Sequence, residues 1–257
     1  MKRPNSAVWY HGPSTIDGSL IVGAVSGLVN PSNNDKTGDL FQTWMMPDDE
    51  RPNVAVKTGR DRSVCGDCGL RPLNHKATPI EDRPCYVKTF QGPRSVWEYL
   101  SPDAGDPWPV AAAASLSEAP NRVAGLRFGA WGEPTAIPLD AWWSGLLKPL
   151  SRWIDWTNSP GYTHRWRDCD QRWRGYLMAS VHTEGEATEA RGMGWRTYRI
   201  GDPDNRAPWE IECPHATHGV QCANCGLCDG VNGLAIFQRA DGSIGSDRRR
   251  SIVQRIH

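Results

Sequence analysis

The sequence contains no run of about 18 apolar residues, the length that a membrane-spanning helix needs. Met1-Lys2-Arg3 is basic, but no apolar segment of signal-peptide length follows it. We therefore expect no membrane partner and a location in a reducing cytoplasm. There, cysteines serve as metal ligands more often than as disulfides.

The chain also lacks an excess of charge, because lysine plus arginine and aspartate plus glutamate number 29 each. A neutral chain is poorly suited to coating a phosphate backbone non-specifically. Two local basic segments remain, residues 165–174 and 248–250, and we interpret the second as a solvated tail.

Several catalytic signatures are missing. The sequence has no serine nucleophile elbow, phosphate-binding P-loop, H-E-x-x-H pair or EF-hand, which argues against hydrolase and kinase classes. It has no internal repeat and no low-complexity segment. Thirteen tryptophans are present, and we expect most of them in the core or in pocket walls.

Seven of the eight cysteines fall into two groups. The second group is a C-x2-C-x2-C run with a remote cysteine upstream that precedes Pro214: Cys222, Cys225, Cys228 and Cys213. Bacterial ferredoxins hold iron–sulfur clusters with the same local run, and their remote ligand also precedes a proline. The spacing favours a 4Fe–4S cluster at these four residues, with zinc as the alternative.

The first group is Cys65, Cys68 and Cys85, one ligand short of a closed four-ligand site. The fourth ligand could be His75, Cys169, a residue near the other group or an exogenous molecule. Two interpretations stay open. One is a second 4Fe–4S cluster with an open iron, and the other is a zinc knuckle completed by His75.

The 257 residues are long enough for one α/β domain. We expect a strand-rich segment over about residues 1–60, a first cysteine loop over 65–85 and a C-terminal cysteine loop over 213–228. The pattern predicts strands at 122–128, 153–156, 176–181 and 194–200, and helices at 92–100, 139–150 and 184–191. Alternation of this kind predicts a parallel sheet arranged as a partial (β/α) barrel with metal-bound cysteine loops.

Ligands of parallel sheets gather beyond the carboxyl ends of the strands. The pattern places Gly132-Glu133, Thr157-Asn158, and Ser180 with His182 at such ends. His164 is either a ligand or acid/base group at a strand end, or a loop histidine that holds the backbone. Glu133 is either a ligand-binding carboxylate or a buried structural one.

The segment 127–134, which contains Gly132-Glu133-Pro134, resembles the Gly-Gly-Glu-Pro loop of radical S-adenosylmethionine enzymes. Thr157-Asn158, Ser180 and the pair Cys85-Tyr86 are similar to further motifs of that family. The resemblance implies that S-adenosylmethionine binds at Gly132, Glu133, Thr157, Asn158 and Ser180. The family's C-x3-C-x2-C motif is replaced here by C-x2-C-x16-C.

A longer resemblance covers most of the chain and points to an uncharacterised family encoded by actinobacterial phages and prophages. It is carried by six stretches: residues 12–18, 36–44, 65–68 with 85–87, 127–134, 161–164 and the final cysteine run. This resemblance implies a phage origin, and the host's bacterial cytoplasm as the location.

Three functions follow as hypotheses. The first is a phage-type iron–sulfur enzyme, similar to radical S-adenosylmethionine enzymes, that acts on a nucleotide, a nucleic acid or a host factor. His164 and Glu133 are its candidate catalytic residues. The second is a metal-stapled protein, with iron–sulfur or zinc sites, that binds host nucleic acid or a host protein. The third is an electron-transfer partner, which would need no pocket at the strand ends.

Overall fold

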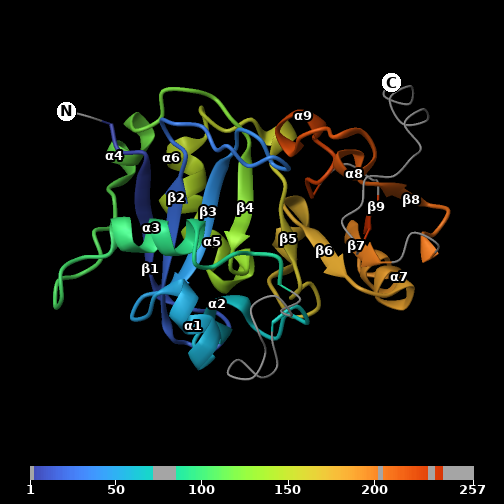
Figure 1. Cartoon of the computed structure of the whole chain (residues 1–257), viewed down its shortest axis with the longest axis horizontal. Helices are drawn as coiled ribbons and strands as arrows, with labels where there is room; N and C mark the ends of the chain where they lie inside the picture. The colour runs from blue at the N-terminus through green and yellow to red at the C-terminus, as the bar shows by residue number, and fades with distance from the viewer. Residues whose placement is uncertain (1–2, 72–84, 202–204, 231–234, 240–257) are drawn as a thin grey trace.

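The computed structural model describes residues 3–71, 85–201, 205–230 and 235–239, and its strands form two hydrogen-bonded sheets (Figure 1). The first has the order β1(Ser6–Pro13), β2(Leu20–Ser26), β3(Phe41–Pro47), β4(Leu126–Trp131). The second has the order β5(Tyr162–Thr163), β6(Met178–Val181), β7(Thr197–Gly201), β9(Ala235–Arg239), β8(Glu210–Glu212). A parallel bridge between Phe128 and Gly161 places β5 beside β4.

Strand direction changes within the first sheet. β1, β2 and β3 pair antiparallel, whereas β4 pairs with β3 in parallel, and all the pairs of the second sheet are parallel. From β3 to β7 the strands therefore lie side by side in chain order and point the same way. This confirms the expected α/β class with a parallel sheet, and the strands within the described ranges do not close into a barrel.

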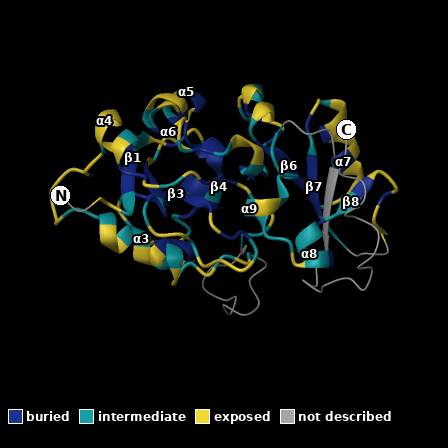
Figure 2. Cartoon of the chain, turned by 90° about the horizontal axis from the view of Figure 1, so that it is seen from above, coloured by how far each residue is buried: buried dark blue, intermediate teal, exposed yellow. Residues whose placement is uncertain are grey.

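Helical segments fill the crossovers that parallel strands require. Figure 2 shows α5 and α6 on one side of the first sheet and α3 on the other. No helix within the described ranges is long and apolar enough to cross a membrane. The segments are α1(Pro52–Thr58), α2(Arg62–Cys65), α3(Gly92–Leu100), α4(Ala113–Glu118), η2(Pro134–Ala136), α5(Leu139–Trp142), η3(Trp143–Leu147), α6(Lys148–Leu150), η4(Trp156–Asn158), η5(Gln171–Gly175), α7(Glu184–Gly192), α8(Pro214–His218) and α9(Cys222–Cys225).

The core lies on both sides of β3, all of whose residues are buried. A central strand that is covered on both faces usually has a continuous apolar sequence. The sequence of β3 comes close to this pattern with Phe41-Gln42-Thr43-Trp44-Met45-Met46. Tryptophan supplies much of the buried area, as predicted. Eight of the thirteen are buried: Trp9, Trp44, Trp108, Trp131, Trp142, Trp166, Trp173 and Trp195.

Most of the predicted elements are confirmed. The helices at 92–100, 139–150 and 184–191 are present, the second as the continuous series α5, η3, α6. The strands predicted at 122–128, 176–181 and 194–200 are present with shifted bounds, as β4, β6 and β7. The strand predicted at 153–156 is reduced to a single parallel bridge between Ile154 and Ala124. Asp155 accepts hydrogen bonds from the backbone N–H and hydroxyl of Thr157, which starts the 3-10 turn η4 instead.

The turn after β4 requires glycine at position 132. Gly132 has φ of +84°, and a Cβ there would lie 2.5 Å from the Met45 carbonyl oxygen of β3. We expect Gly132→Ala to cost about 2 kcal/mol or more, since the left-handed backbone and the overlap both oppose it. This lowers the melting temperature by roughly 4–8 °C. Gly18→Ala is the control, because Gly18 has φ of +77° but open space around its Cβ position. Equal losses in the two variants would contradict the packing role of Gly132.

Candidate functional site

The first cysteine group lies at the carboxyl edge of the parallel strands. α2 packs against β3 and η2 and ends at Cys65. The backbone N–H of Glu133, directly after β4, donates to the carbonyl of Val64 at 2.6 Å. The structure therefore brings the cysteine loop and the Gly132-Glu133-Pro134 turn together.

An ion pair fixes the loop that carries Cys65 and Cys68. Arg71 donates from Nε and Nη2 to the two carboxylate oxygens of Asp61, at 2.9 and 2.8 Å, and Asp61 is 1% exposed. Arg71 also donates to the Gly66 carbonyl at 2.7 Å. The sequence does not indicate this pair, because nothing local in it distinguishes two charged residues ten positions apart.

Glu133 and His164 meet at the same edge. His164 follows β5, and its backbone N–H donates to Glu133 Oε2 at 3.1 Å. The imidazole Nδ1 lies 3.8 Å from the same oxygen. Glu133 is 5% exposed and also accepts a hydrogen bond from the Thr135 hydroxyl at 3.4 Å. Both candidate catalytic residues are thus in contact, and Glu133 is the buried partner of His164.

The imidazole of His164 also reaches the first cysteine group. Burial by itself lowers the pKa of His164, but hydrogen bonding to Cys68 and Glu133 raises it to about 10. The Nε2 atom is buried and has no hydrogen-bond partner of normal geometry. Glu133 therefore fixes His164, and the Cys68 thiol lies near enough to affect the pKa of the imidazole.

A second histidine continues the arrangement. His182 follows β6 and stacks on His164, with ring centroids 5.5 Å apart and planes inclined by 15°. Its side chain borders an open cavity of about 530 Å³ at the carboxyl ends of β6 and β7. The other residues lining the cavity include Thr183, Arg199 and Arg206. The sequence placed His182 at a strand end, and the structure adds the cavity beside it.

The thiols of the first group act on one another. Burial raises the pKa of Cys65, and the nearby Asp61, Cys85 and Cys68 raise it further. Burial likewise raises the pKa of Cys85, with Cys68 and Asp61 adding to the effect. A neutral thiol binds metal weakly, so a cation would bind here by displacing the thiol protons.

The cysteines are not preformed as a metal site. In the part of the chain that the structure describes, no three His, Cys, Asp or Glu side chains are arranged to hold a metal ion. The metal-bound loops therefore stay a prediction. Of the candidate fourth ligands, His75 lies outside the described residues. The basic segment 248–250 also lies outside them. Cys169 lies near Glu133, and its burial raises the pKa to about 12.

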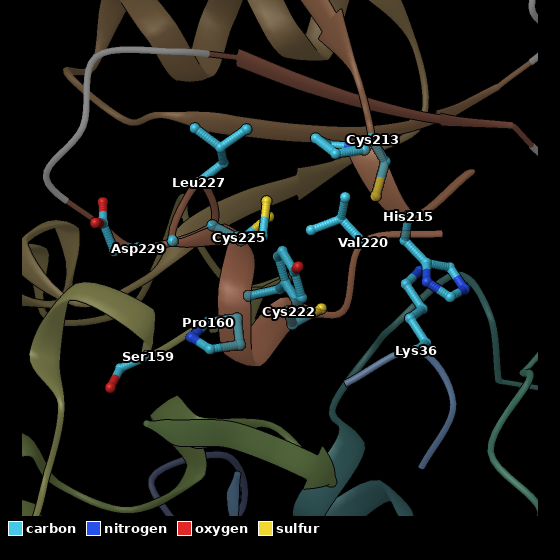
Figure 3. A pocket seen from close by; sticks show the side chains of 14 residues that line it. Lys36, Ser159, Pro160, Cys213, His215, Val220, Cys222, Cys225, Leu227 and Asp229 are labelled. Atoms are coloured by element: carbon cyan, nitrogen blue, oxygen red, sulfur yellow. The ribbon is translucent and has the colours of Figure 1, made fainter. Parts of the chain in front are cut away.

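The second cysteine group lies at the opposite edge of the sheet. Cys213 follows β8, while α9 and the residues after it supply the other three thiols. All four line one small pocket: Cys213, Cys222, Cys225 and Cys228. Figure 3 shows Cys213 on the opposite side of this pocket from Cys222 and Cys225. Figure 1 shows α9 at one end of the strands and α2 at the other.

Backbone hydrogen bonds clamp the second cysteine loop to distant segments. Cys222 and Ala223 donate to the carbonyls of Lys36 and Thr37 at 3.0 Å each. The carbonyl of Cys228 accepts from Gly161, which immediately precedes β5, at 3.2 Å. Arg196 adds a buried hydrogen bond to the Leu227 carbonyl at 2.7 Å. The loop therefore joins the N-terminal, central and C-terminal parts of the described chain.

Burial disfavours free thiolates at the second group, and two nearby cations oppose this effect in part. Burial raises the pKa of Cys222 to about 11, aided by Cys213, whereas Lys36 and Arg127 lower it. Burial raises the pKa of Cys228 still more strongly. Two cations beside four thiols would offset part of the negative charge that a bound metal or cluster leaves.

Two predicted cofactor contacts are placed elsewhere by the structure. Thr157 and Asn158 lie in η4, before β5, so the prediction that they lie at a strand's carboxyl end is wrong. Instead they contact the second cysteine loop, where a Cβ on Gly226 would lie 2.7 Å from the Thr157 carbonyl oxygen. Ser180 is buried within β6 and pairs with Tyr198 of β7. Of the five predicted contacts, only Gly132 and Glu133 therefore adjoin the first cysteine group.

Both cysteine groups and the edge residues are thus placed by the fold, and a search for relatives adds nothing to them. Comparisons of the chain with protein-family models, with curated proteins and with solved structures found no match.

Proposed function

We propose that this chain is an iron–sulfur enzyme of the radical S-adenosylmethionine type, with its reactive cluster at Cys65, Cys68 and Cys85. The observation that carries the proposal is the convergence of this cysteine loop with Gly132-Glu133-Pro134 at the carboxyl edge of β3 and β4. The chain order of parallel strands from β3 to β7 supports a partial (β/α) barrel around that edge.

The residues present fit such a centre in their chemistry. Burial and the neighbouring thiols raise the pKa of Cys65 and Cys85, and a bound cation would offset this effect. When bound, the cluster would supply the electron for reductive cleavage of S-adenosylmethionine. The protein would supply three thiolates, a rigid Glu133–His164 pair, and an open cavity beside His182 for a substrate.

The substrate class in this proposal is a nucleotide, a nucleic acid or a host factor. The cavity is lined by Arg199 and Arg206, but both guanidinium groups already have partners on or near Glu210. It is therefore an opening of mixed character rather than a strongly cationic phosphate site.

A second candidate function is favoured by the other edge of the sheet. There, four cysteines surround a nearly filled space, and the loop is clamped to Lys36, Thr37 and Gly161. A metal at such a position acts as a staple. A chain with zinc at both groups would be a metal-stapled binding protein for a host nucleic acid or host protein.

The test is an anaerobic preparation analysed for iron, sulfide and zinc, then assayed with reductant and S-adenosylmethionine. We expect about eight irons per chain, from two clusters of four irons each, together with formation of methionine and 5′-deoxyadenosine. Cys65→Ala should lose half of the iron and all of the cleavage, whereas Cys169→Ala should keep both.

The assay is repeated with nucleotides and with oligonucleotides, since turnover without substrate is slow in uncoupled reactions. The enzyme proposal would be refuted if a fully iron-loaded protein formed no cleavage products under any of these conditions. A colourless protein with zinc at both groups would support the staple instead.

A further inference from the structure

We propose that the open cavity beside His182 binds a ligand with an α-amino acid group, whose ammonium faces Glu184 and whose carboxylate faces Arg206. Among the substrate classes of the proposed function, this favours a host factor that carries such a group over a nucleotide. The inference does not rest on a metal at either cysteine group, nor on the radical reaction.

The position of the cavity is the first argument. In sheets of parallel strands, ligands gather beyond the carboxyl ends of the strands, where loops lead into the following helices. The cavity occupies such a place, because His182 and Thr183 lead from β6 into α7, and Arg199 belongs to β7. Its volume of about 530 Å³ falls in the range of about 300–1,000 Å³ that is usual for small-molecule sites. The polar groups around this space therefore decide which small molecule it fits.

One wall is the start of α7, where only one of two carboxylates has a partner within the fold. Thr183 caps the helix by accepting a hydrogen bond from the backbone N–H of Glu186 at 3.1 Å. The Glu186 carboxylate accepts from the backbone N–H of His182 at 2.8 Å and pairs with Arg167 at 3.6 Å. Glu184 lines the cavity, is exposed, and forms no ion pair within the described residues. Its charge is therefore available to a ligand.

Another wall is the segment 205–208, which the buried pair of Arg199 and Glu210 holds in place. Arg199 donates to the Glu210 carboxylate at 2.7 and 2.5 Å and to the Asn205 carbonyl at 2.7 Å. The same carboxylate accepts from the backbone N–H of Ala207 at 2.9 Å. This wall is therefore ordered before a ligand binds, which lowers the entropic cost of binding.

Arg206 brings a positive charge to the cavity. Its Nη1 donates to the backbone carbonyl of Glu210 at 2.6 Å, and no carboxylate in the described part of the chain pairs with it. Arg199 adds little net charge, because both oxygens of the Glu210 carboxylate are bonded to its guanidinium. The cavity is thus lined by one carboxylate and one guanidinium that do not pair with each other, Glu184 and Arg206.

The charges of the lining select a zwitterion. Burial lowers the pKa of His182, and the nearby His164 lowers it further, so the imidazole is neutral at neutral pH. A purely anionic ligand would be repelled by Glu184, and a purely cationic ligand by Arg206. A ligand with both charges complements the two side chains. Pro208 also lines the cavity and offers apolar contact to the rest of the ligand.

Two sources could supply this group. One is a free amino acid, and the other is the S-adenosylmethionine of the proposed function, whose methionine part has the same ammonium and carboxylate. The order of affinities separates them. Tighter binding of S-adenosylmethionine than of any amino acid identifies the cofactor as the source, and the reverse order identifies a free amino acid.

The experiment is calorimetric titration of the full chain with each protein amino acid, with S-adenosylmethionine and with adenosine monophosphate. We expect saturable binding of an amino acid or of S-adenosylmethionine, and none of adenosine monophosphate. The N-acetyl and carboxamide derivatives of the tightest compound should each bind at least about tenfold more weakly, because each lacks one charged contact.

Two variants assign the contacts to their residues. Glu184→Gln should weaken the parent compound about tenfold but leave the N-acetyl derivative unchanged, since that derivative has no ammonium. Arg206→Gln should weaken the parent compound to the same extent but leave the carboxamide unchanged. Glu189→Gln is the matched control, because Glu189 lies on the same helix but pairs with Arg167 at 2.7 Å. All three residues are exposed, so the variants should fold as the wild type does.

The inference is overturned if no amino acid and no S-adenosylmethionine binds saturably, or if adenosine monophosphate alone binds. It is also overturned if Glu184→Gln and Arg206→Gln weaken the parent compound and its blocked derivatives equally. A protein that holds no iron, or that does not cleave S-adenosylmethionine, would refute the proposed enzyme activity while leaving this binding result intact.

Discussion

Under the proposed function, Cys213→Ser is expected to remove a metal bound by the second cysteine group and to destabilise the whole fold. Cys213 is 6% exposed, lines the pocket with the other three thiols, and starts α8 by accepting hydrogen bonds from Ala216 and Thr217. Structural metal sites contribute folding free energy directly, because the site does not exist in the unfolded chain. We expect a loss of at least about 4 kcal/mol, which lowers the melting temperature by roughly 8–16 °C.

The measurement combines metal analysis with thermal unfolding of wild type and variant. Cys169→Ser is the control, since Cys169 is half-buried and lies outside both cysteine groups. It should change neither metal content nor melting temperature by more than a small amount. A Cys213→Ser protein that kept its metal and its melting temperature would show that Cys213 is not a ligand.

The cysteine spacing predicted which thiols belong together better than it predicted where each group lies. Short-range spacing reflects what a loop can wrap around, so Cys222, Cys225 and Cys228 were grouped correctly, and Cys213 lines the same pocket. The position of that pocket beyond the start of β5 depends on hydrogen bonds from Cys222 and Ala223 to residues 36 and 37. Contacts between such distant segments have no local signal in a single sequence.

The residues predicted at strand ends were also placed correctly only where the local sequence marks the end of a strand. Gly132-Glu133 was placed correctly because an apolar run followed by a Gly-Glu-Pro turn marks the end of a strand. Thr157-Asn158 was misplaced, since both residues belong to a 3-10 turn that starts at Trp156 and is capped by Asp155. β5 itself is two residues long and gave no periodic pattern, so the side-by-side placement of His164 and Glu133 emerged only from the fold.

The two edges of the sheet have different chemical characters, which is why a single metal type need not serve both. At the second group the space among the four thiols is nearly filled, and the loop is clamped by backbone bonds. At the first group the histidine pair leads from the thiols to an open cavity. The proposed function therefore places a closed staple at one edge and a reactive centre at the other.

Glu210→Ala is expected to destabilise the wall of that open cavity strongly. Arg199 donates from Nε and Nη2 to the Glu210 carboxylate at 2.7 and 2.5 Å, and the two side chains are 4% and 0% exposed. Glu210 also accepts from the backbone N–H of Ala207 at 2.9 Å. Removing the carboxylate takes away the buried counter-charge that Glu210 supplies to the guanidinium, which costs about 3–5 kcal/mol. The melting temperature should fall by roughly 6–20 °C.

Asp140→Ala supplies the contrast, because Asp140 pairs with Arg172 at 2.9 Å but the side chains are 80% and 59% exposed. Exposed pairs contribute less than about 1 kcal/mol, so its unfolding curve should nearly match that of wild type. The double variant Arg199→Met/Glu210→Leu should recover much of the stability lost in Glu210→Ala, since it removes the unpaired charge while keeping the volume. A melting temperature for Glu210→Ala equal to that of Asp140→Ala would mean that water reaches Arg199, and that the pair does not hold the cavity wall.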